Sequence, residues 1–266
     1  MEKIDVHKNA TSQAFLNIAW DIFFNKKNRG ISLERHFPWL FDKTLNYTAI
    51  EMKLHDEVVG GLVVVEKIIN NLKIGLVGLV CIREKFRGNG LLEKLMTTLD
   101  KVSCEEKFSM LVLWTSQHWL YKPYGFNVDD DSIIAKMQLK KDYPDCIDIS
   151  KTFNTTDEYD IPLPPFADKL LKYKDKNVEF IYCEKGNEKY LLDYTGSTDM
   201  VIKTFFANIS QNFTLNSFDG KLKELASVDS YAHIDITKQQ IQMVKILNKT
   251  EEESLKDIRF AVYERI

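Results

Sequence analysis

The sequence predicts an α/β fold of the α+β type, in which a mixed, mostly antiparallel twisted sheet is flanked by helices. We expect two such domains in tandem. Three observations lead to this prediction. Strand-type segments follow one another with short turns between residues 47 and 82. An amphipathic helix and a short apolar strand come next. A similar order of elements returns after a proline-rich segment near residue 160.

The composition is that of a folded globular protein. Hydrophobic residues make up 44% of the 266 residues and charged residues 28%, which is far from the composition of disordered chains. The net charge is −3, and Lys and Arg are scattered, so we expect no nucleic-acid partner. The apolar stretches fall short of the roughly 20 residues of a membrane span, and the first residues lack the apolar core of a signal peptide. We therefore expect no membrane association and a cytoplasmic location.

The four cysteines give no sign of a metal site. Cys81, Cys104, Cys146 and Cys183 are dispersed, without CxxC spacing. Buried or incidental thiols are therefore expected rather than disulfides or zinc ligands. We predict that the protein uses no metal.

The first half is predicted to contain a helix, an antiparallel meander, a second helix and further strands. The turn residues at 55–57 and 70–71 separate the strands of the meander. In the second helix, apolar residues recur every three or four positions from Leu91 to Val102. The expected elements are a helix at 12–24, strands at 47–54, 58–69 and 73–82, a helix at 91–102, and strands at 110–114 and 133–139.

The second half is predicted to repeat this order. A hairpin is expected around Lys185-Gly186-Asn187, because β-type runs flank this turn sequence. The expected elements are a helix at 166–173, strands at 178–183 and 190–194, a helix at 198–209, a strand at 213–215, a helical turn at 221–226, and strands within 231–247 and 259–264. The predicted domains are 1–145 and 166–266, joined by a linker at 146–165.

The stretch FRGNGLL, residues 86–92, is a candidate binding loop. Gly88 and Gly90 allow a tight turn that gathers backbone N–H groups, and the start of the following helix adds unpaired donors and partial positive charge. Such a loop can bind phosphate, although two glycines alone are also compatible with a simple strand-to-helix turn. The nucleotide-triphosphate pattern GxxxxGK is absent, and Glu93 stands where a dinucleotide loop requires glycine or alanine.

The wider stretch VCIREKFRGNGLLEKLM resembles the acyl-CoA loop of the GNAT superfamily of N-acyltransferases. That loop is a strand, then Arg or Gln, two residues, Gly, one residue, Gly or Ala, and a helix. Arg87, Gly90 and Leu92 occupy the three key positions, with leucine in place of a small residue at the third. A Tyr-x-x-x-Gly-Phe element, which GNAT domains carry downstream, matches Tyr121 to Phe126. The resemblance covers residues 45–140, and the second half is similar by element order to the degenerate second domain of tandem GNAT proteins.

The resemblance implies a fold, a co-substrate and residue roles. It implies a GNAT fold in two tandem domains and an enzyme that uses acetyl-CoA or another short acyl-CoA. A backbone N–H near Ile82 would hold the thioester carbonyl, and the Tyr121 hydroxyl would donate a proton to the leaving sulfur, with Tyr124 as the alternative. A packed aromatic is the structural alternative for Tyr121. The implied cofactor-binding residues are Val80, Cys81, Ile82, Arg87, Gly88, Asn89, Gly90, Leu91, Leu92 and Tyr121.

An acceptor amine must lose a proton before it attacks. An alkyl amine with a pKa of about 10.4 is mostly protonated at neutral pH. Glu51, Glu66 and His118 are the candidate bases, because the resemblance places the two glutamates in strands at the cleft and His118 lies just before Tyr121. As alternatives, the glutamates are solvent-facing strand residues, His118 is a polar helix residue, or the acceptor is a less basic amine such as an amino sugar.

Aromatic residues are the candidates for the acceptor pocket. Trp39, Trp114 and Ser116 are predicted to bind the acceptor, although the tryptophans are equally compatible with a core. The expected partner is a small-molecule amine, and we favour a nucleotide-linked amino sugar. An antibiotic, a polyamine or a peptide amine remains open, as does a sensor that binds acyl-CoA without turnover.

Overall fold

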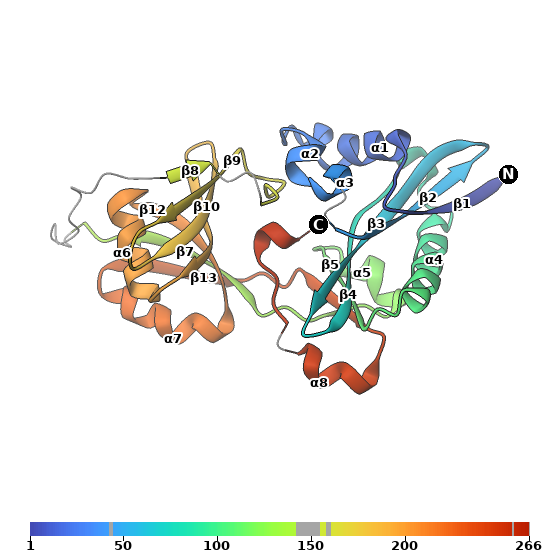
Figure 1. The fold of residues 1–266 in the computed structure, drawn as a ribbon. Coiled ribbons are helices and arrows are strands. Elements are labelled where there is room, and N and C mark those ends of the chain that lie inside the picture. The colour runs from blue at the N-terminus through green and yellow to red at the C-terminus, as the bar shows by residue number, and fades with distance from the viewer. Residues whose placement is uncertain (43–44, 142–154, 158–160, 257, 266) are drawn as a thin grey trace. The chain divides into compact units, whose positions relative to one another are not determined.

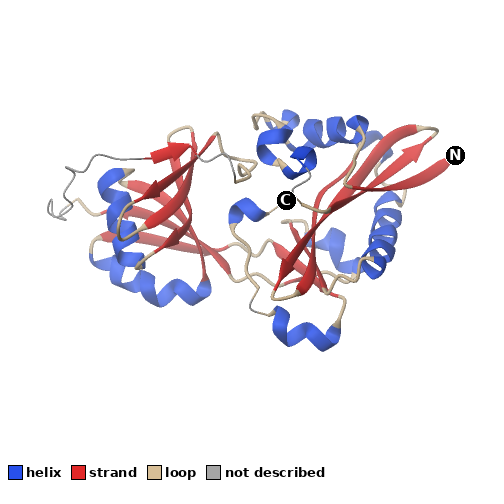
Figure 2. Cartoon of the chain, in the orientation of Figure 1, coloured by secondary structure: helices blue, strands red, loops and turns tan. Residues whose placement is uncertain are grey.

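The computed structural model describes residues 1–42, 45–141, 155–157, 161–256 and 258–265, which form two compact units (Figure 1). Unit 1 consists of residues 1–129, 241–260 and 264–266, and unit 2 of residues 130–240 and 261–263. Each unit is built on a mixed, mostly antiparallel sheet of seven described strands with helices beside it (Figure 2). The predicted fold class is therefore confirmed.

The sheet of unit 1 has the strand order β1-β2-β3-β4-β5-β14-β6. Neighbouring strands are antiparallel except for β4 and β5, which are parallel. The bounds are β1 (Glu2–Lys8), β2 (Tyr47–Leu54), β3 (Glu57–Ile69), β4 (Leu72–Ile82), β5 (Met110–Trp114), β6 (Asn127–Val128) and β14 (Gln242–Ile246). The predicted meander is β2-β3-β4.

Helices cover both faces of this sheet. Val63 and Val65 of β3 pack in the apolar cluster of α1, whereas Val64 packs in that of α4, as the alternation of side chains along a strand requires. Figure 1 shows α1 and α4 on opposite sides of the strands. The α-helices are α1 (Gln13–Phe23), α2 (Leu33–His36), α3 (Trp39–Asp42), α4 (Leu91–Glu105), α5 (His118–Tyr121) and α8 (Glu252–Leu255). The 3-10 helices are η1 (Asn25–Lys27), η2 (Glu84–Phe86), η3 (Lys122–Tyr124) and η6 (Lys249–Glu251).

The sheet of unit 2 has the order β13-β7-β12-β11-β10-β9-β8. Phe205 of α6 packs against Phe180, Tyr182 and Phe213 of the sheet and fixes this helix on one face. The strands are β7 (Ser132–Leu139), β8 (Thr155–Asp157), β9 (Lys169–Lys174), β10 (Glu179–Lys185), β11 (Glu188–Thr195), β12 (Asn212–Phe218) and β13 (Ala232–Lys238). The helices are α6 (Thr198–Asn208), α7 (Leu222–Leu225), η4 (Asp219–Lys221), η5 (Ala226–Ser230) and η7 (Val262–Glu264).

Two predicted elements of the second half are wrong. The helix expected at 166–173 is largely the strand β9, which pairs with β10 and β8. Leu170 and Leu171 enter different apolar clusters, so both faces of this strand are buried and its short apolar run has no alternation to reveal it. The strand expected within 259–264 is also wrong. The described residues of this segment form no strand, and the segment ends in the 3-10 helix η7.

The chain divides differently from the predicted domains 1–145 and 166–266. β7 pairs with β12 and β13 in unit 2, although it lies in the predicted first domain. β14 pairs with β5 in unit 1, from Gln242 opposite Trp114 to Ile246 opposite Met110, although it lies in the predicted second domain. Each sheet is thus completed by a strand from the other half of the sequence. Of the predicted linker 146–165, residues 146–154, which include Cys146, and 158–160 lie outside the described residues.

The described cysteines are free thiols. Cys81 and Cys183 are buried, and Cys104 is exposed. Within the described ranges, no group of three or more His, Cys, Asp and Glu side chains is arranged to hold a metal ion. No helix in this part of the chain has the length and apolar character needed to cross a membrane.

Candidate functional site

The strands β4 and β5 of unit 1 separate after a short parallel pairing. They pair only from Ile74 opposite Met110 to Leu76 opposite Val112. β4 then continues to Ile82 with β3 as its ladder partner, while β5 ends at Trp114. Among the described strands, none pairs with the other edge of β4 over 77–82. An open strand edge of this kind can bind an extended ligand through main-chain hydrogen bonds.

The backbone of Ile82 is directed toward this open edge. The N–H of Arg83 donates to the Val59 carbonyl of β3 at 2.9 Å. Because bonded and non-bonded residues alternate in an antiparallel ladder, the N–H and carbonyl of Ile82 point away from β3. The Ile82 carbonyl accepts a hydrogen bond from Arg87 Nε at 3.0 Å. The N–H of Ile82 thus faces the side on which a ligand would lie along β4.

A β-bulge in β4 lies just before this point. Gly61 is opposite Cys81 and Val63 is opposite Gly78, so Leu79 and Val80 together face Leu62. Leu79 has a φ of 51°, which is uncommon for a branched residue. A bulge bends its strand and turns the following backbone groups to a new direction. This bulge was not predicted from the sequence.

The glycine loop has the geometry of an anion site. Gly88 and Gly90 have φ values of 79° and 71°, and a Cβ at either position would meet no described heavy atom within 4 Å. Gly90 is the N-cap of α4 and has no side chain to satisfy the first N–H groups of the helix. The uncapped start of the helix carries the positive end of the helix dipole. A loop of this kind can bind an anion.

The side chains beside the glycines support the loop. Asn89 Nδ2 donates to the carbonyls of Phe86 at 3.1 Å and Arg87 at 3.3 Å. Leu91 is buried, and Leu92 is partly buried against the apolar cluster of α4. The leucine that replaces a small residue thus packs into unit 1.

Tyr121 lies at the end of α5 and is 8% exposed. Its ring packs edge-on to Phe126 at 6.2 Å. Burial, followed by the charge of Cys81, raises the pKa of Tyr121 to about 12. The hydroxyl therefore keeps its proton at neutral pH and can act as a donor.

Glu51 is a buried anchor of α1. Its carboxylate accepts hydrogen bonds from Thr11 Oγ1 at 2.9 Å, Ser12 N at 2.6 Å and Ser12 Oγ at 2.5 Å. Glu51 is fully buried, so the alternative that it is a solvent-facing strand residue is wrong. With three donors around it, this carboxylate holds the start of α1.

Glu66 lies at the opposite end of the sheet from the glycine loop. It is opposite Gly75 on β4, which is seven residues before Ile82. Because β4 has a bulge between these residues, the separation is better counted on β3, where six residues from Glu66 to Gly60 correspond to about 20 Å at about 3.3 Å per residue. Its carboxylate is 2.6 Å from Lys73 Nζ. Glu66 is therefore too remote to act on an amine near Ile82.

His118 is the remaining candidate base and lies on the same helix turn as Tyr121. Its Nε2 is buried and has no hydrogen-bond partner among the described residues. An unsatisfied buried ring nitrogen is costly and often marks a functional group. Neighbouring Trp119, another candidate for the acceptor pocket, is 71% exposed.

The predicted acceptor residues have different environments. Trp39 is 2% exposed and packs edge-on to Phe37 and Tyr47, so its position is in the core. Trp114 is partly buried, donates from Nε1 to Gln242 Oε1 at 3.2 Å and packs edge-on to Phe260. Ser116 is exposed in the loop between β5 and α5. We therefore retain Ser116 and the accessible part of Trp114.

Comparisons with known proteins identify the fold. No family model and no curated protein matches the sequence. Similar solved structures include a probable N-acyltransferase from Enterococcus faecalis V583 (13% identity, TM-score 0.63) and a GCN5-related N-acetyltransferase from Kribbella flavida (9%, 0.58). Eis1 from Mycobacterium abscessus is also similar (12%, 0.58). These matches cover 92% of this chain and 73%, 72% and 73% of those chains, respectively. The chain therefore has the fold of the GNAT N-acetyltransferases, with two such domains in tandem.

Proposed function

We propose that this protein is an acyl-CoA-dependent N-acyltransferase whose site lies in unit 1. One observation carries the proposal: the open edge of β4 leads directly into the glycine loop and the uncapped start of α4. A strand edge suits an extended arm, and an uncapped helix start suits a pyrophosphate. Acyl-CoA has both parts and would supply an activated acyl thioester, with acetyl-CoA or another short acyl-CoA as the co-substrate.

The backbone would do most of the binding. The open edge of β4 would pair with the amide-containing arm of CoA, and the N–H of Ile82 would donate to the thioester carbonyl. The N–H groups of residues 88–92 would hold the pyrophosphate, with Arg87 adding positive charge. Val80 and Cys81 belong to the same strand segment. This arrangement favours direct attack of the amine on the thioester through a tetrahedral intermediate.

Tyr121 is proposed as the proton donor to the leaving sulfur. With its pKa raised to about 12, it remains protonated at neutral pH. It lies at the end of α5 and is 8% exposed. Tyr124, three residues later and less buried, is the alternative donor.

His118 is proposed as the base that receives the amine proton, directly or through water. Glu51 is held by three donors, and Glu66 lies about 20 Å along the sheet from Ile82. The Nε2 of His118 is buried and has no hydrogen-bond partner among the described residues, and His118 lies on the same helix turn as Tyr121. Removal of a proton by a positioned side chain contributes about 10²–10⁴ in rate.

A small-molecule primary amine is the proposed acceptor, and we favour a nucleotide-linked amino sugar. The exposed ring of Trp119 beside His118 supports this choice, because aromatic faces pack well on sugars and bases. An antibiotic, a polyamine or a peptide amine would present the same reacting group. An acyl-CoA sensor without turnover is the non-enzymatic alternative.

Thiol release from a panel of short acyl-CoAs tests the proposal. Nucleotide-linked amino sugars, aminoglycosides, polyamines and peptides serve as acceptors, and CoA binding is measured in parallel by calorimetry. At least one amine should accelerate thiol release. CoA binding with no turnover for any amine would favour the sensor, and absence of CoA binding would overturn the site.

A further inference from the structure

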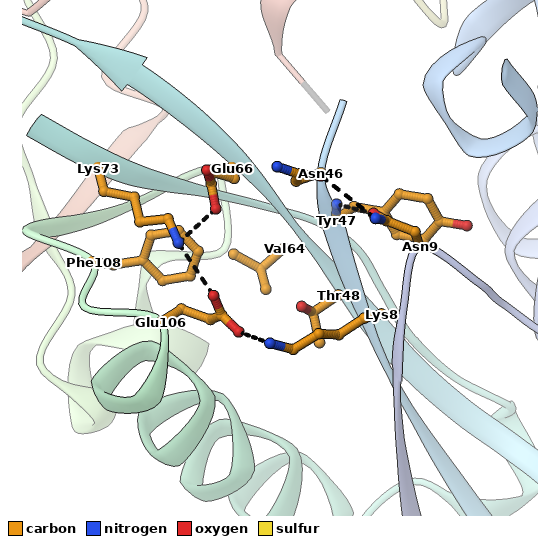
Figure 3. Close-up of a pocket in the computed structure, with 10 residues that line it drawn as sticks. All are labelled: Lys8, Asn9, Asn46, Tyr47, Thr48, Val64, Glu66, Lys73, Glu106 and Phe108. Atoms are coloured by element: carbon orange, nitrogen blue, oxygen red, sulfur yellow. Dashed lines mark hydrogen bonds and ion pairs between the residues drawn. The ribbon is translucent and has the colours of Figure 1, made fainter. Parts of the chain in front are cut away.

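Unit 1 contains a second cavity, remote from the proposed acyl-transfer site. It has a volume of about 310 Å³ and lies where β1, β2, β3 and β4 meet the end of α4 (Figure 3). Lys73 on its wall is opposite Ile68 on β3, and Ile68 is eight residues from Gly60, the partner of Ile82, which corresponds to about 26 Å at about 3.3 Å per residue. The volume suits a small metabolite, since ligand pockets start at about 300 Å³. None of the groups proposed for acyl transfer is needed here.

Four charged side chains of alternating sign line one side of this cavity. Lys73 Nζ lies 2.6 Å from Glu66 and 3.1 Å from Glu106, and Glu106 also pairs with Lys8. Figure 3 shows these groups around the apolar side chain of Val64, with Phe108 beneath Lys73. Lys73 Nζ lies 5.4 Å from the centre of the Phe108 ring. The cavity thus has an apolar floor and both signs of charge on its wall.

The four charges are not equally accessible. The side chains of Glu66, Glu106 and Lys73 are 17%, 19% and 28% exposed, whereas that of Lys8 is 71% exposed. The inner three groups therefore carry two negative charges and one positive charge, with the second positive charge at the mouth. A ligand ammonium would complement the inner carboxylates, and a ligand carboxylate would meet Lys8. These four charges already pair with one another, so a bound zwitterion would replace part of this pairing.

We propose that this cavity binds a free α-amino acid or a similarly small zwitterion, with its ammonium group at Glu66 and Glu106 and its carboxylate at Lys8. The opposite wall adds neutral polar groups from Asn9, Asn46 and Thr48, which can accept or donate further hydrogen bonds. Binding here is independent of the acyl-transfer proposal, and it gives unit 1 a second ligand site.

Calorimetry on the full chain with the twenty common amino acids tests the proposal. At least one amino acid should bind with one-to-one stoichiometry. Its carboxamide analogue, which lacks the carboxylate, and its desamino analogue, which lacks the ammonium, should each bind at least tenfold more weakly. Absence of binding at millimolar concentration, or equal binding of the carboxamide, would overturn the proposal. Equal binding of the carboxamide would indicate a site for simple cations.

Two variants test whether the amino acid binds in this cavity. Glu106→Gln should weaken amino-acid binding at least tenfold, whereas Glu105→Gln, a change at the exposed neighbouring residue of α4, should leave it unchanged. Lys8→Met provides a second test, because an exposed side chain can be replaced without loss of folding, and it should remove the preference for the amino acid over its carboxamide. Unchanged affinity in both Glu106→Gln and Lys8→Met would place the ligand elsewhere.

Discussion

Arg87 donates a hydrogen bond from Nε to the backbone carbonyl of Ile82 at 3.0 Å. Arg87 therefore ties the glycine loop back to Ile82, the last residue of β4. This bond fixes the loop relative to the strand edge along which CoA would bind. It also directs the Arg87 side chain by a contact that lysine cannot reproduce in the same form.

Replacement of Arg87 by alanine should weaken CoA binding about tenfold, which corresponds to about 1.4 kcal/mol. The change removes both the contact to Ile82 and a positive charge beside the loop. Lys101→Ala, a change at an exposed residue of α4, is the matched control and should leave the affinity unchanged. Calorimetric titration with CoA measures both. Equal affinities would show that Arg87 has no part in the site.

Gly90→Ala should reduce CoA affinity and stability together. A φ of 71° costs a residue with a Cβ about 1 to 2 kcal/mol, and the new methyl group would occupy the open space above the loop. Gly186 of unit 2 has a φ of 55° and equally open surroundings, so Gly186→Ala should cost similar stability without affecting CoA binding. Urea unfolding and calorimetry separate the two effects. Full CoA affinity in Gly90→Ala would contradict a phosphate at this loop.

Tyr121→Phe should lower kcat about 100-fold with little change in CoA affinity, because only the proton donor is lost. Since its pKa is raised to about 12, the wild-type enzyme should show no loss of this donor up to pH 10. Tyr124→Phe is the comparison and should retain at least a third of the activity. The reverse order of effects would assign the donor role to Tyr124.

Glu51→Gln should act on stability. Its carboxylate accepts three hydrogen bonds at the start of α1, and hydrogen bonds to charged groups contribute about 1.5 to 3 kcal/mol. We expect a decrease of about 2 kcal/mol in the free energy of unfolding, measured in urea, and turnover per folded molecule close to wild type. Glu34→Gln, at an exposed residue, should change neither. Loss of turnover with unchanged stability would restore Glu51 as a candidate base.

The buried thiols predict alkaline instability. Burial raises the pKa of Cys81 and of Cys183 to about 12 from 9.0. Above pH 9 the unfolded chain loses these protons while the folded chain keeps them, so the free energy of unfolding falls as pH rises from 9 to 12. Below pH 9 this contribution is constant.

Cys81→Ala should make this fall shallower, whereas Cys104→Ala, at an exposed thiol, should not. Urea unfolding between pH 7 and pH 10.5 gives the slope for each variant. An unchanged slope in Cys81→Ala would contradict the raised pKa of this thiol.

Local sequence patterns were sufficient to predict the strands and the helix around the glycine loop. The strands and the helix flanking Arg87 to Leu92 were predicted close to their observed bounds, because alternation and helical periodicity are visible within short windows. The hairpin of β10 and β11 was also predicted from its turn residues. The prediction of a helix in place of β9 was wrong, because the sequence of a strand buried on both faces resembles that of a short buried helix.

The sequence by itself determined the loop, its helix and the spacing to Tyr121, since these features depend on neighbouring residues. Only the tertiary structure decided that β14 completes the first sheet and β7 the second, because strand pairing joins residues such as Trp114 and Gln242 that are far apart in the chain. The tertiary structure also separated the candidate bases from one another. Glu51, Glu66 and His118 are all residue types that can act as a base, and the structure separates them through burial, hydrogen-bond donors and distance along the sheet. Those quantities exist only once the chain has folded.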